Sequence, residues 1–331
     1  MYKLHTIEYN GQTLRIPDYN LLKKIEQKTA KVPKVTTKKG EITALTLKNA
    51  GISDITHLRH LQSLQKIDLS STKVADLSPL KHLDNLLTLK LAKTNVSDLS
   101  PLSPLTSLDL RGTQVPDLSP LKDLNNLRVL DLSRIKVSDF SPLVHLNHLR
   151  VLNGTWTDVS DLFPLANLRD LRVLLLEGTN VADLTPLRNL IRLETLHLTD
   201  TEFSEISALT QLRNLRNLDL EGTNVSDLSP LKSVETLQVL NLSHTDVNVA
   251  SLKQLRTIRE LDLSHTRISD LSPLNEFHCL QVLDLEDTFV SNVYTLRNLE
   301  NLRIVDLSNT RVSAEDRVVE FLKEQGVQIV L

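Results

Sequence analysis

A pattern of apolar residues that recurs every 22 residues constrains this chain more than any other feature. The pattern LxxLxLxxTxVxDLSPLxxLxxL aligns with the sequence thirteen times, and ten of the twelve steps are 22 residues long. Such a period is typical of stacked coils, because one unit cannot bury its apolar side chains without neighbours. The sequence therefore predicts a solenoid, whose central strand position falls at Leu47, Leu69, Leu91, Leu110, Leu132, Gly154, Leu176, Leu198, Leu220, Leu242, Leu263, Leu285 and Leu307.

Two steps are shorter than the period. A 19-residue step contains Ser103 and Pro104, which we expect to shorten the return segment, and a 21-residue step follows Leu242. Aromatic residues make up only 3% of the chain and there is one Met, so the core is expected to consist mainly of stacked leucines.

Within each unit, two leucines separated by one residue predict a short strand, because strand side chains alternate between faces. A hydroxyl residue before proline follows, as in Ser78-Pro79, Ser141-Pro142 and Thr185-Pro186, and is expected to cap a helical turn. The short return favours 3₁₀ or irregular helix. We therefore predict an α/β solenoid in which parallel strands form the concave face.

Two polar positions recur with the period. Asp54, Asp76 and their equivalents precede the helical turn, where Asp favours bonding to nearby backbone N–H groups. A threonine follows the strand in eleven units, from Thr72 to Thr310, and is expected to tie the turn to the neighbouring coil. We interpret both positions as structural and not as binding sites.

The 22-residue unit resembles that of the bacterial internalin family of leucine-rich-repeat proteins over residues 41–313. The segment from Ile16 to Asn20, followed by Leu21 to Ile25, resembles that family's helical N-terminal cap. The resemblance implies a module that binds a partner protein on its concave face. Thr replaces the family's usual Asn in the turn, aromatic residues are nearly absent from the predicted face, and no signal peptide or wall-anchoring segment is present, so surface display does not carry over.

The ends are expected to be closed by caps, which would make the 331 residues a complete unit. Residues 1–40 are predicted to form a hairpin around Asn10-Gly11 and a helix from Asp18 to about Thr29. Residues 41–313 form the predicted solenoid. In residues 314–331 we expect a helix from Val318 to Glu324 and a final strand from Val327 to Leu331.

Composition limits the partners. A net charge of −3 gives no electrostatic signature for nucleic acid. No segment has the length and apolar character needed to insert into a membrane. The lone Cys279 excludes an intrachain disulfide. We expect a monomer without cofactor, cytoplasmic as the sequence stands, or secreted or surface-displayed if it comes from a processed or truncated protein.

The predicted concave face carries acidic residues between the paired leucines of seven units, and Asp262, Asp284 and Asp306 follow one another there. Strands about 4.8 Å apart bring these like charges close together, which raises the cost of ionising all three. Arginines three residues earlier are expected to offset them, namely Arg128, Arg150, Arg172, Arg216, Arg259 and Arg303. The acidic row is either a site for a cation or basic partner, or a solvated face.

An apolar patch interrupts this acidic pattern. Val129, Val151 and Val173 share one outward position, and Leu175 replaces the usual Asp or Asn. Trp156 follows the strand in the middle of these units. We predict a protein-binding patch, with polar neighbours Asp131, Arg134, His197 and Asp219. Alternatively, Trp156 folds inward to fill the space left where Gly154 replaces Leu.

His244 and His265 occupy equivalent positions in adjacent units, near Asp287. Two imidazoles and a carboxylate can ligate zinc, but here the repeat itself sets their spacing, so they are a weak metal candidate. No catalytic motif is present. We predict a non-enzymatic protein-binding module. The alternatives are a cytosolic regulatory or adaptor subunit that recruits a basic partner along the acidic row, and a metal-dependent activity.

Overall fold

The fold is that of a computed structural model, which describes residues 6–29, 32–102 and 105–331. The chain divides into two compact units, Met1–Thr157 and Asp158–Leu331, and each is described by itself. The expected shortening at Ser103 and Pro104 lies outside the described residues.

The first unit begins with an antiparallel hairpin and a helix. The helix starts at Ile16, two residues before the predicted start, and Asp18 instead accepts a hydrogen bond from the backbone N–H of Ile42, at 3.2 Å. An unpredicted strand, antiparallel to the first coil strand, follows the helix. These elements are β1 (Thr6–Tyr9), β2 (Gln12–Arg15), α1 (Ile16–Thr29), β3 (Lys34–Lys38) and β4 (Glu41–Thr46).

From β4 onward, the first unit is a stack of coils whose strands pair in parallel. Its strands are β5 (Lys66–Asp68), β6 (Thr88–Lys90), β7 (Ser107–Asp109), β8 (Val129–Asp131) and β9 (Val151–Asn153). Its 3₁₀ helices are η1 (Thr56–His60), η2 (Ser78–Leu80), η3 (Ser119–Asp123) and η4 (Ser141–Leu143).

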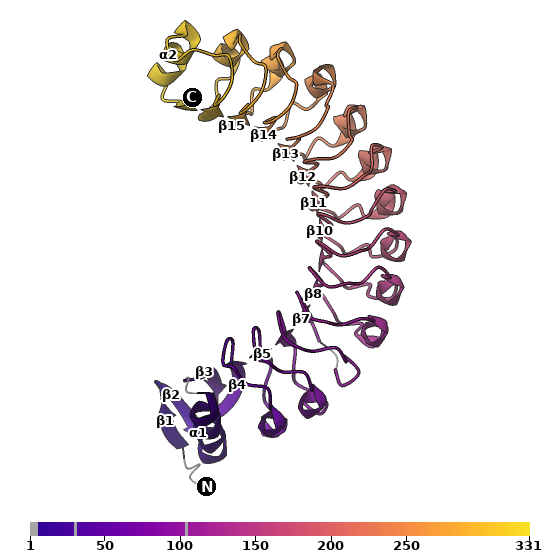
Figure 1. Cartoon of the computed structure of the whole chain (residues 1–331), viewed down its shortest axis with the longest axis vertical. Helices are drawn as coiled ribbons and strands as arrows, with labels where there is room; N and C mark the ends of the chain where they lie inside the picture. The colour runs from indigo at the N-terminus through magenta and orange to yellow at the C-terminus, as the bar shows by residue number, and fades with distance from the viewer. Residues whose placement is uncertain (1–5, 30–31, 103–104) are drawn as a thin grey trace. The chain divides into compact units, whose positions relative to one another are not determined.

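The second unit repeats this arrangement, with its strands on the inner side of the curved stack and its helices on the outer side (Figure 1). Its strands are β10 (Val173–Leu175), β11 (Thr195–His197), β12 (Asn217–Asp219), β13 (Val239–Asn241), β14 (Glu260–Asp262), β15 (Val282–Asp284), β16 (Ile304–Asp306) and β17 (Gln328–Val330). Its helices are η5 (Phe163–Leu165), η6 (Thr185–Asn189), η7 (Ser207–Gln211), η8 (Ser229–Ser233), η9 (Val249–Gln254), η10 (Ser272–Glu276), η11 (Tyr294–Asn298) and α2 (Arg317–Glu324).

The core of each unit is a set of leucine columns. Leu130 and Leu132 in the first unit and Leu218 and Leu220 in the second have no measurable exposure. Burying one such side chain contributes about 1.5–3 kcal/mol, so every coil depends on the coils beside it. The predicted solenoid with parallel strands and short 3₁₀ returns is confirmed.

The recurrent threonine is buried, but it does not link neighbouring coils as expected. In Thr223, for example, the hydroxyl donates to the carbonyl of Leu220 in its own coil, at 2.7 Å. The hydroxyl therefore closes the turn after the strand. Equivalent bonds are made by Thr72, Thr94, Thr113, Thr157, Thr179, Thr201, Thr245, Thr266, Thr288 and Thr310.

The recurrent aspartate before most of the 3₁₀ helices is structural, as predicted, but the serine next to the proline is not the cap. In η8, Asp227 accepts from the backbone N–H and the hydroxyl of Ser229, both at 2.8 Å. These bonds hold the pKa of Asp227 below its usual value. The same backbone bond is made by Asp54, Asp76, Asp98, Asp117, Asp139, Asp161, Asp183 and Asp270.

The C-terminal helix α2 starts one residue before the predicted Val318. Asp316 caps it by accepting from the backbone N–H of Val318, at 2.7 Å. The strand β17 then pairs in parallel with β16, which places Ile329 opposite Val305. These elements cover the last coil of the second unit.

Candidate functional site

The outward carboxylates of the strands also cap turns. In Asp131, Oδ1 accepts from the backbone N–H of Ser133, two residues on, at 2.9 Å. Asn153 makes the same bond to Thr155, so the position selects a short side-chain acceptor whether or not it is charged. The other members of this capping column are Asp68, Asp109, Asp219, Asn241, Asp262, Asp284 and Asp306.

Three members of this column form the predicted acidic row in the second unit. Strand pairing sets Asp262 beside Asp284 and Asp284 beside Asp306. Burial raises the pKa of Asp284, and the charges of Asp262 and Asp306 raise it further. The expected cost of ionising neighbouring carboxylates is therefore present at the central residue.

The second unit also holds half of the predicted apolar patch. Val173 lies beside Thr195, and Leu175 lies beside His197, on the neighbouring strands β10 and β11. All four side chains are partly exposed. Leu175 and His197 occupy the capping column without supplying the usual cap, and Asp219 resumes it on β12.

His197 has an unusual environment for a surface residue. Its Nε2 atom is buried and has no hydrogen-bond partner among the residues that the structure describes. A buried polar atom of this kind costs about 1–3 kcal/mol if it remains unpaired. The fold therefore leaves one nitrogen of this partly exposed ring without a hydrogen bond.

The first unit holds the other predicted patch residues. Val129 on β8 pairs with Val151 on β9, and Val129 is 38% exposed. Trp156 follows β9 and is 47% exposed, so the hypothesis that it fills the space beside Gly154 is wrong. Arg134 occupies the equivalent turn position one coil earlier and is also exposed.

The backbone explains why Trp156 points outward. Its φ is 56°, in the left-handed region that the equivalent residues of other turns also adopt. Those residues include Arg134 and His244, and Gly takes the position at Gly178 and Gly222. A bulky side chain is uncommon there, and the conformation costs roughly 1 kcal/mol or more. The tight turn thus holds the indole away from the core.

The weak metal candidate has a geometry that does not favour chelation. The rings of His244 and His265 stack, with centroids 4.3 Å apart and planes inclined by 11°. Parallel stacked rings direct their nitrogens alongside one another and not toward a common point. Asp287 instead lies 3.1 Å from Nδ1 of His265, and within the described ranges no cluster of three such side chains could hold a metal ion.

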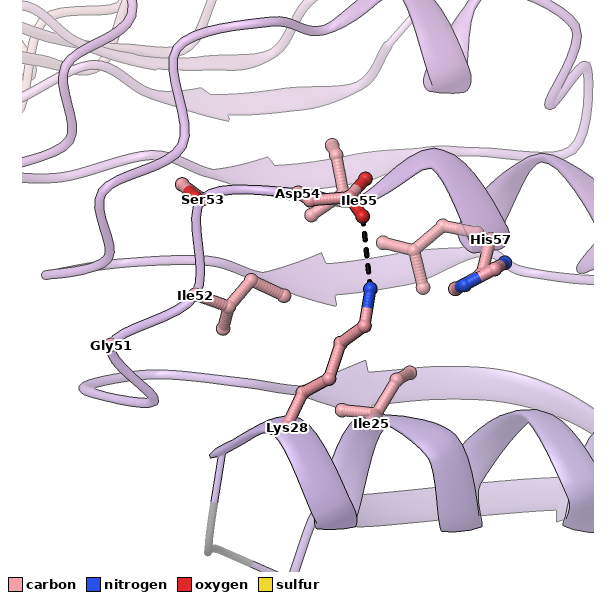
Figure 2. A pocket seen from close by; sticks show the side chains of 9 residues that line it. Ile25, Lys28, Gly51, Ile52, Ser53, Asp54, Ile55 and His57 are labelled. Carbon is pink, nitrogen blue, oxygen red and sulfur yellow. Dashed lines mark hydrogen bonds and ion pairs between the residues drawn. The ribbon is translucent and has the colours of Figure 1, made fainter.

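A pocket of about 260 Å³ lies where α1 covers the first coil (Figure 2). Ile25 and Ile52 contribute to its apolar lining, and Lys28 forms an ion pair with Asp54 at 3.0 Å. Bonds from Thr56 and from Lys28 hold the pKa of Asp54 well below its usual range.

This pocket marks the open end of the stack. In several later coils the N–H at the position of Gly51 bonds to the preceding coil, as that of Lys73 does to the carbonyl of Ile52 at 2.8 Å, and Gly51 has no preceding coil. Ser53, Asp54 and His57 surround the pocket. In the described part of the chain, no hydrogen bond joins His57 to the other two, so they do not form a nucleophile–base pair.

The structure also shows face residues that sequence reasoning passed over. Val282 and Ile304 lie side by side on β15 and β16, and Ile304 is 38% exposed. They occupy the same strand position as Val129 and Val173, so reading that position in every unit would have found them.

Comparisons with known proteins agree with this architecture. Residues 105–145 and 191–233 match a family described as Leucine Rich repeats (2 copies). An internalin, inlF, from Listeria monocytogenes is similar in structure, with a TM-score of 0.75 and 24% identity over 88% of this chain and 96% of that chain. A leucine-rich-repeat protein from Leptospira interrogans has a TM-score of 0.62 and 22% identity, over 83% of this chain and 86% of its own.

The mouse RP105/MD-1 complex contains a further similar chain. Its TM-score is 0.67 and its identity 25%, over 82% of this chain and 51% of that chain. A comparison with curated protein sequences gives no match. Among the described residues, no helix is long and apolar enough to span a membrane.

Proposed function

We propose that this chain, a leucine-rich-repeat protein of internalin-like fold, is a non-enzymatic module that binds a partner protein through the sheet faces of its two units. The leucine-rich-repeat fold is a common protein–protein interaction module. The capping column carries the proposal. At Leu175 and His197 the column lacks the acceptor that closes the turn and presents a partly exposed apolar side chain and a partly exposed imidazole ring.

The first unit supports the same function. A tryptophan in a left-handed turn is unfavourable for the scaffold, and its 47% exposure means that the core does not gain from it. Tryptophan is enriched among the residues that dominate protein interfaces. Val151 lies on the strand before the turn of Trp156, and Val129 lies on the neighbouring strand β8. Asp131 and Arg134 provide polar neighbours.

Each unit can be tested by its own variant. Trp156→Ser with Val129→Ser tests the first unit, and Leu175→Ser with Val173→Ser tests the second. A protein captured by the wild-type chain from a native lysate should bind at least one variant about tenfold more weakly or worse, because buried hot-spot residues contribute about 2 kcal/mol or more.

The matched control replaces exposed apolar residues in the return segments. Phe163 and Ile191 are 64% and 53% exposed, and Phe163→Ser with Ile191→Ser should leave binding unchanged. Equal binding by wild type and both face variants, with circular dichroism showing that all are folded, would reject the proposal.

A second candidate is a regulatory or adaptor role in which a basic partner docks along Asp262, Asp284 and Asp306. The raised pKa of Asp284 favours it, because a cation from a partner would relieve the crowding of these charges. Binding of this kind should weaken steeply with added salt. Binding that is independent of salt would exclude it.

A further inference from the structure

The second unit carries a row of arginines along the edge where its strands begin. Backbone hydrogen bonds order the row: Gln238 N–H donates to Arg216, and Arg259 N–H donates to Gln238, at 2.9 and 2.7 Å. Gln281 and Arg303 continue it in the same way, at 2.7 and 2.8 Å. Arginine and glutamine therefore alternate, and Arg216, Arg259 and Arg303 lie two strands apart.

These three arginines are exposed and do not offset the aspartates as the sequence suggested. Within the described residues, no ion pair or side-chain hydrogen bond engages any of the three guanidinium groups. Arg172, two strands before Arg216, differs, because it pairs with Glu194 at 2.8 Å. The arginine row thus presents three unused cations about 10 Å apart, twice the spacing of neighbouring strands.

The acidic row runs parallel to the arginine row. Each arginine stands one residue before its strand begins, and the acidic residue ends that strand three positions on, as in Arg303 and Asp306 of β16, which corresponds to roughly 10 Å. On β15, glutamine takes the arginine position before Asp284. Between the rows lies a column of mixed character, which strand pairing orders as Asn217, Val239, Glu260, Val282 and Ile304. The face therefore has a basic edge, a partly apolar centre and an acidic edge.

We infer that this face of Asp158–Leu331 binds an amphipathic α-helix of a partner protein, lying across the strands with acidic residues on one flank and basic residues on the other. The inference rests on the proposed protein-binding function and specifies the partner. Seven residues of α-helix rise about 10.5 Å, so carboxylates one heptad apart meet Arg216, Arg259 and Arg303 in turn. A helix about 10–12 Å wide places its other flank against the acidic row.

The spacing does not suit an extended peptide. Three residues of a strand also span about 10 Å, but side chains three positions apart in a strand point to opposite faces. An extended segment therefore cannot direct equally spaced carboxylates at the arginine row. A polyanion would meet Arg216, Arg259 and Arg303 but would be repelled by Asp262, Asp284 and Asp306.

The test uses the full chain and a synthetic three-heptad peptide that is stapled to keep it helical, since short helices are marginal in water. The probe carries glutamate at heptad spacing on one flank, lysine on the other and leucine between them. The comparison peptide has the same composition, with the two charges mixed on both flanks. Isothermal titration at low salt should show about tenfold tighter binding of the probe, from three exposed ion pairs with the arginine row and further pairs with the acidic row.

Charge reversal tests whether the probe peptide binds through the arginine row. Arg216→Glu with Arg259→Glu and Arg303→Glu should abolish the preference for the probe, and a peptide with its glutamates replaced by lysine should then bind better than the probe does. The matched control reverses three exposed cations on the outer helices, with Arg188→Glu, Lys232→Glu and Lys253→Glu, and should keep the wild-type preference.

Equal binding of the two peptides by the wild-type chain, or a preference that survives reversal of the arginine row, would overturn the inference. Preference for an extended peptide of the same charges, or self-association that the arginine variant abolishes, would also overturn it. The proposed protein-binding function is tested separately. It would remain supported if the variant with Leu175→Ser and Val173→Ser loses a captured protein partner, even when the helix inference fails.

Discussion

At the scale of single residues, the carboxyl group of Asp284 has two opposing effects on stability. Its Oδ1 accepts from the backbone N–H of Glu286 at 2.9 Å, which closes a turn, but its charge lies between those of Asp262 and Asp306. Asn153 and Asn241 make the equivalent bond without a charge. Asparagine therefore suits position 284 better than aspartate does at neutral pH.

We predict that Asp284→Asn is as stable as the wild type or more stable at neutral pH, whereas Asp284→Ala, which loses the cap, is less stable than Asp284→Asn by about 1 kcal/mol. The folded pKa of Asp284 is raised above 3.8, so its charge destabilises the fold above that folded pKa. The gain from asparagine should disappear below pH 3.8. Urea unfolding at several pH values checks this, and a gain that persists in acid would contradict it.

At the scale of the element, the short 3₁₀ helices depend on ionised aspartates. The pKa of Asp227 is lowered by bonds from Ser229, and the pKa values of Asp98, Asp117, Asp183 and Asp270 are lowered in the same way. A lowered folded pKa contributes stability that is present above the unfolded value of 3.8 and is lost as the pH falls through the folded value.

We therefore predict that the chain loses stability as the pH falls below 3.8, and that Asp227→Ala loses less over this range than the wild type because one contributing group is absent. Thermal unfolding followed by circular dichroism at neutral pH and at about pH 3 measures the difference. Asp246→Ala serves as the control, because Asp246 is exposed and does not cap a 3₁₀ helix. An identical acid response of Asp227→Ala and wild type would count against the prediction.

The repeat made these elements predictable, because its period fixes where each strand and return falls. Strand β3 was missed because Lys34–Lys38 lies before the first repeat and has no leucine pattern. Sequence alone does not distinguish a hydroxyl cap from an aspartate cap, because hydroxyl and carboxylate side chains can both accept from a backbone N–H. Only the geometry shows that Asp227 accepts and Ser229 donates.

The candidate site was less predictable than the fold. The strand positions of Val129 and Leu175 followed from the alternation of side chains, but the direction of Trp156 did not. The absence of Leu at position 154 suggested a space to be filled, whereas the left-handed φ of Trp156 turns the ring outward. The sequence spacing also does not determine whether the guanidinium of Arg216 reaches a carboxylate, so its lack of an ion pair within the described residues was not predictable.

At the scale of the whole molecule, a stack of coils transmits a defect to its neighbours. Leu218 lies inside the second unit and has no measurable exposure, with Leu196 and Leu240 beside it on the adjacent strands. Every neighbouring coil packs against the one that carries Leu218. In contrast, α2 and β17 lie at the end of the second unit and pack against coils on one side only.

We predict that Leu218→Ala lowers the free energy of unfolding by about 2–5 kcal/mol. Leu322→Ala in α2 should mainly increase local opening near the C-terminus, because a terminal element can separate without disrupting interior coils. Hydrogen exchange distinguishes the two patterns. Loss of protection confined to the coil of Leu218 would contradict the expected spread to adjacent coils.

The left-handed turn position has a consequence for how such a chain can change over time. Residues as different as Ser71, Lys93, Trp156, Asp200 and His244 occupy it with nearly the same φ, between 54° and 57°. The backbone there keeps one conformation with polar, charged and aromatic side chains, although this conformation costs more for a bulky one. Substitutions at this turn position can therefore change which partner surface the protein binds, one side chain at a time, while the fold stays the same.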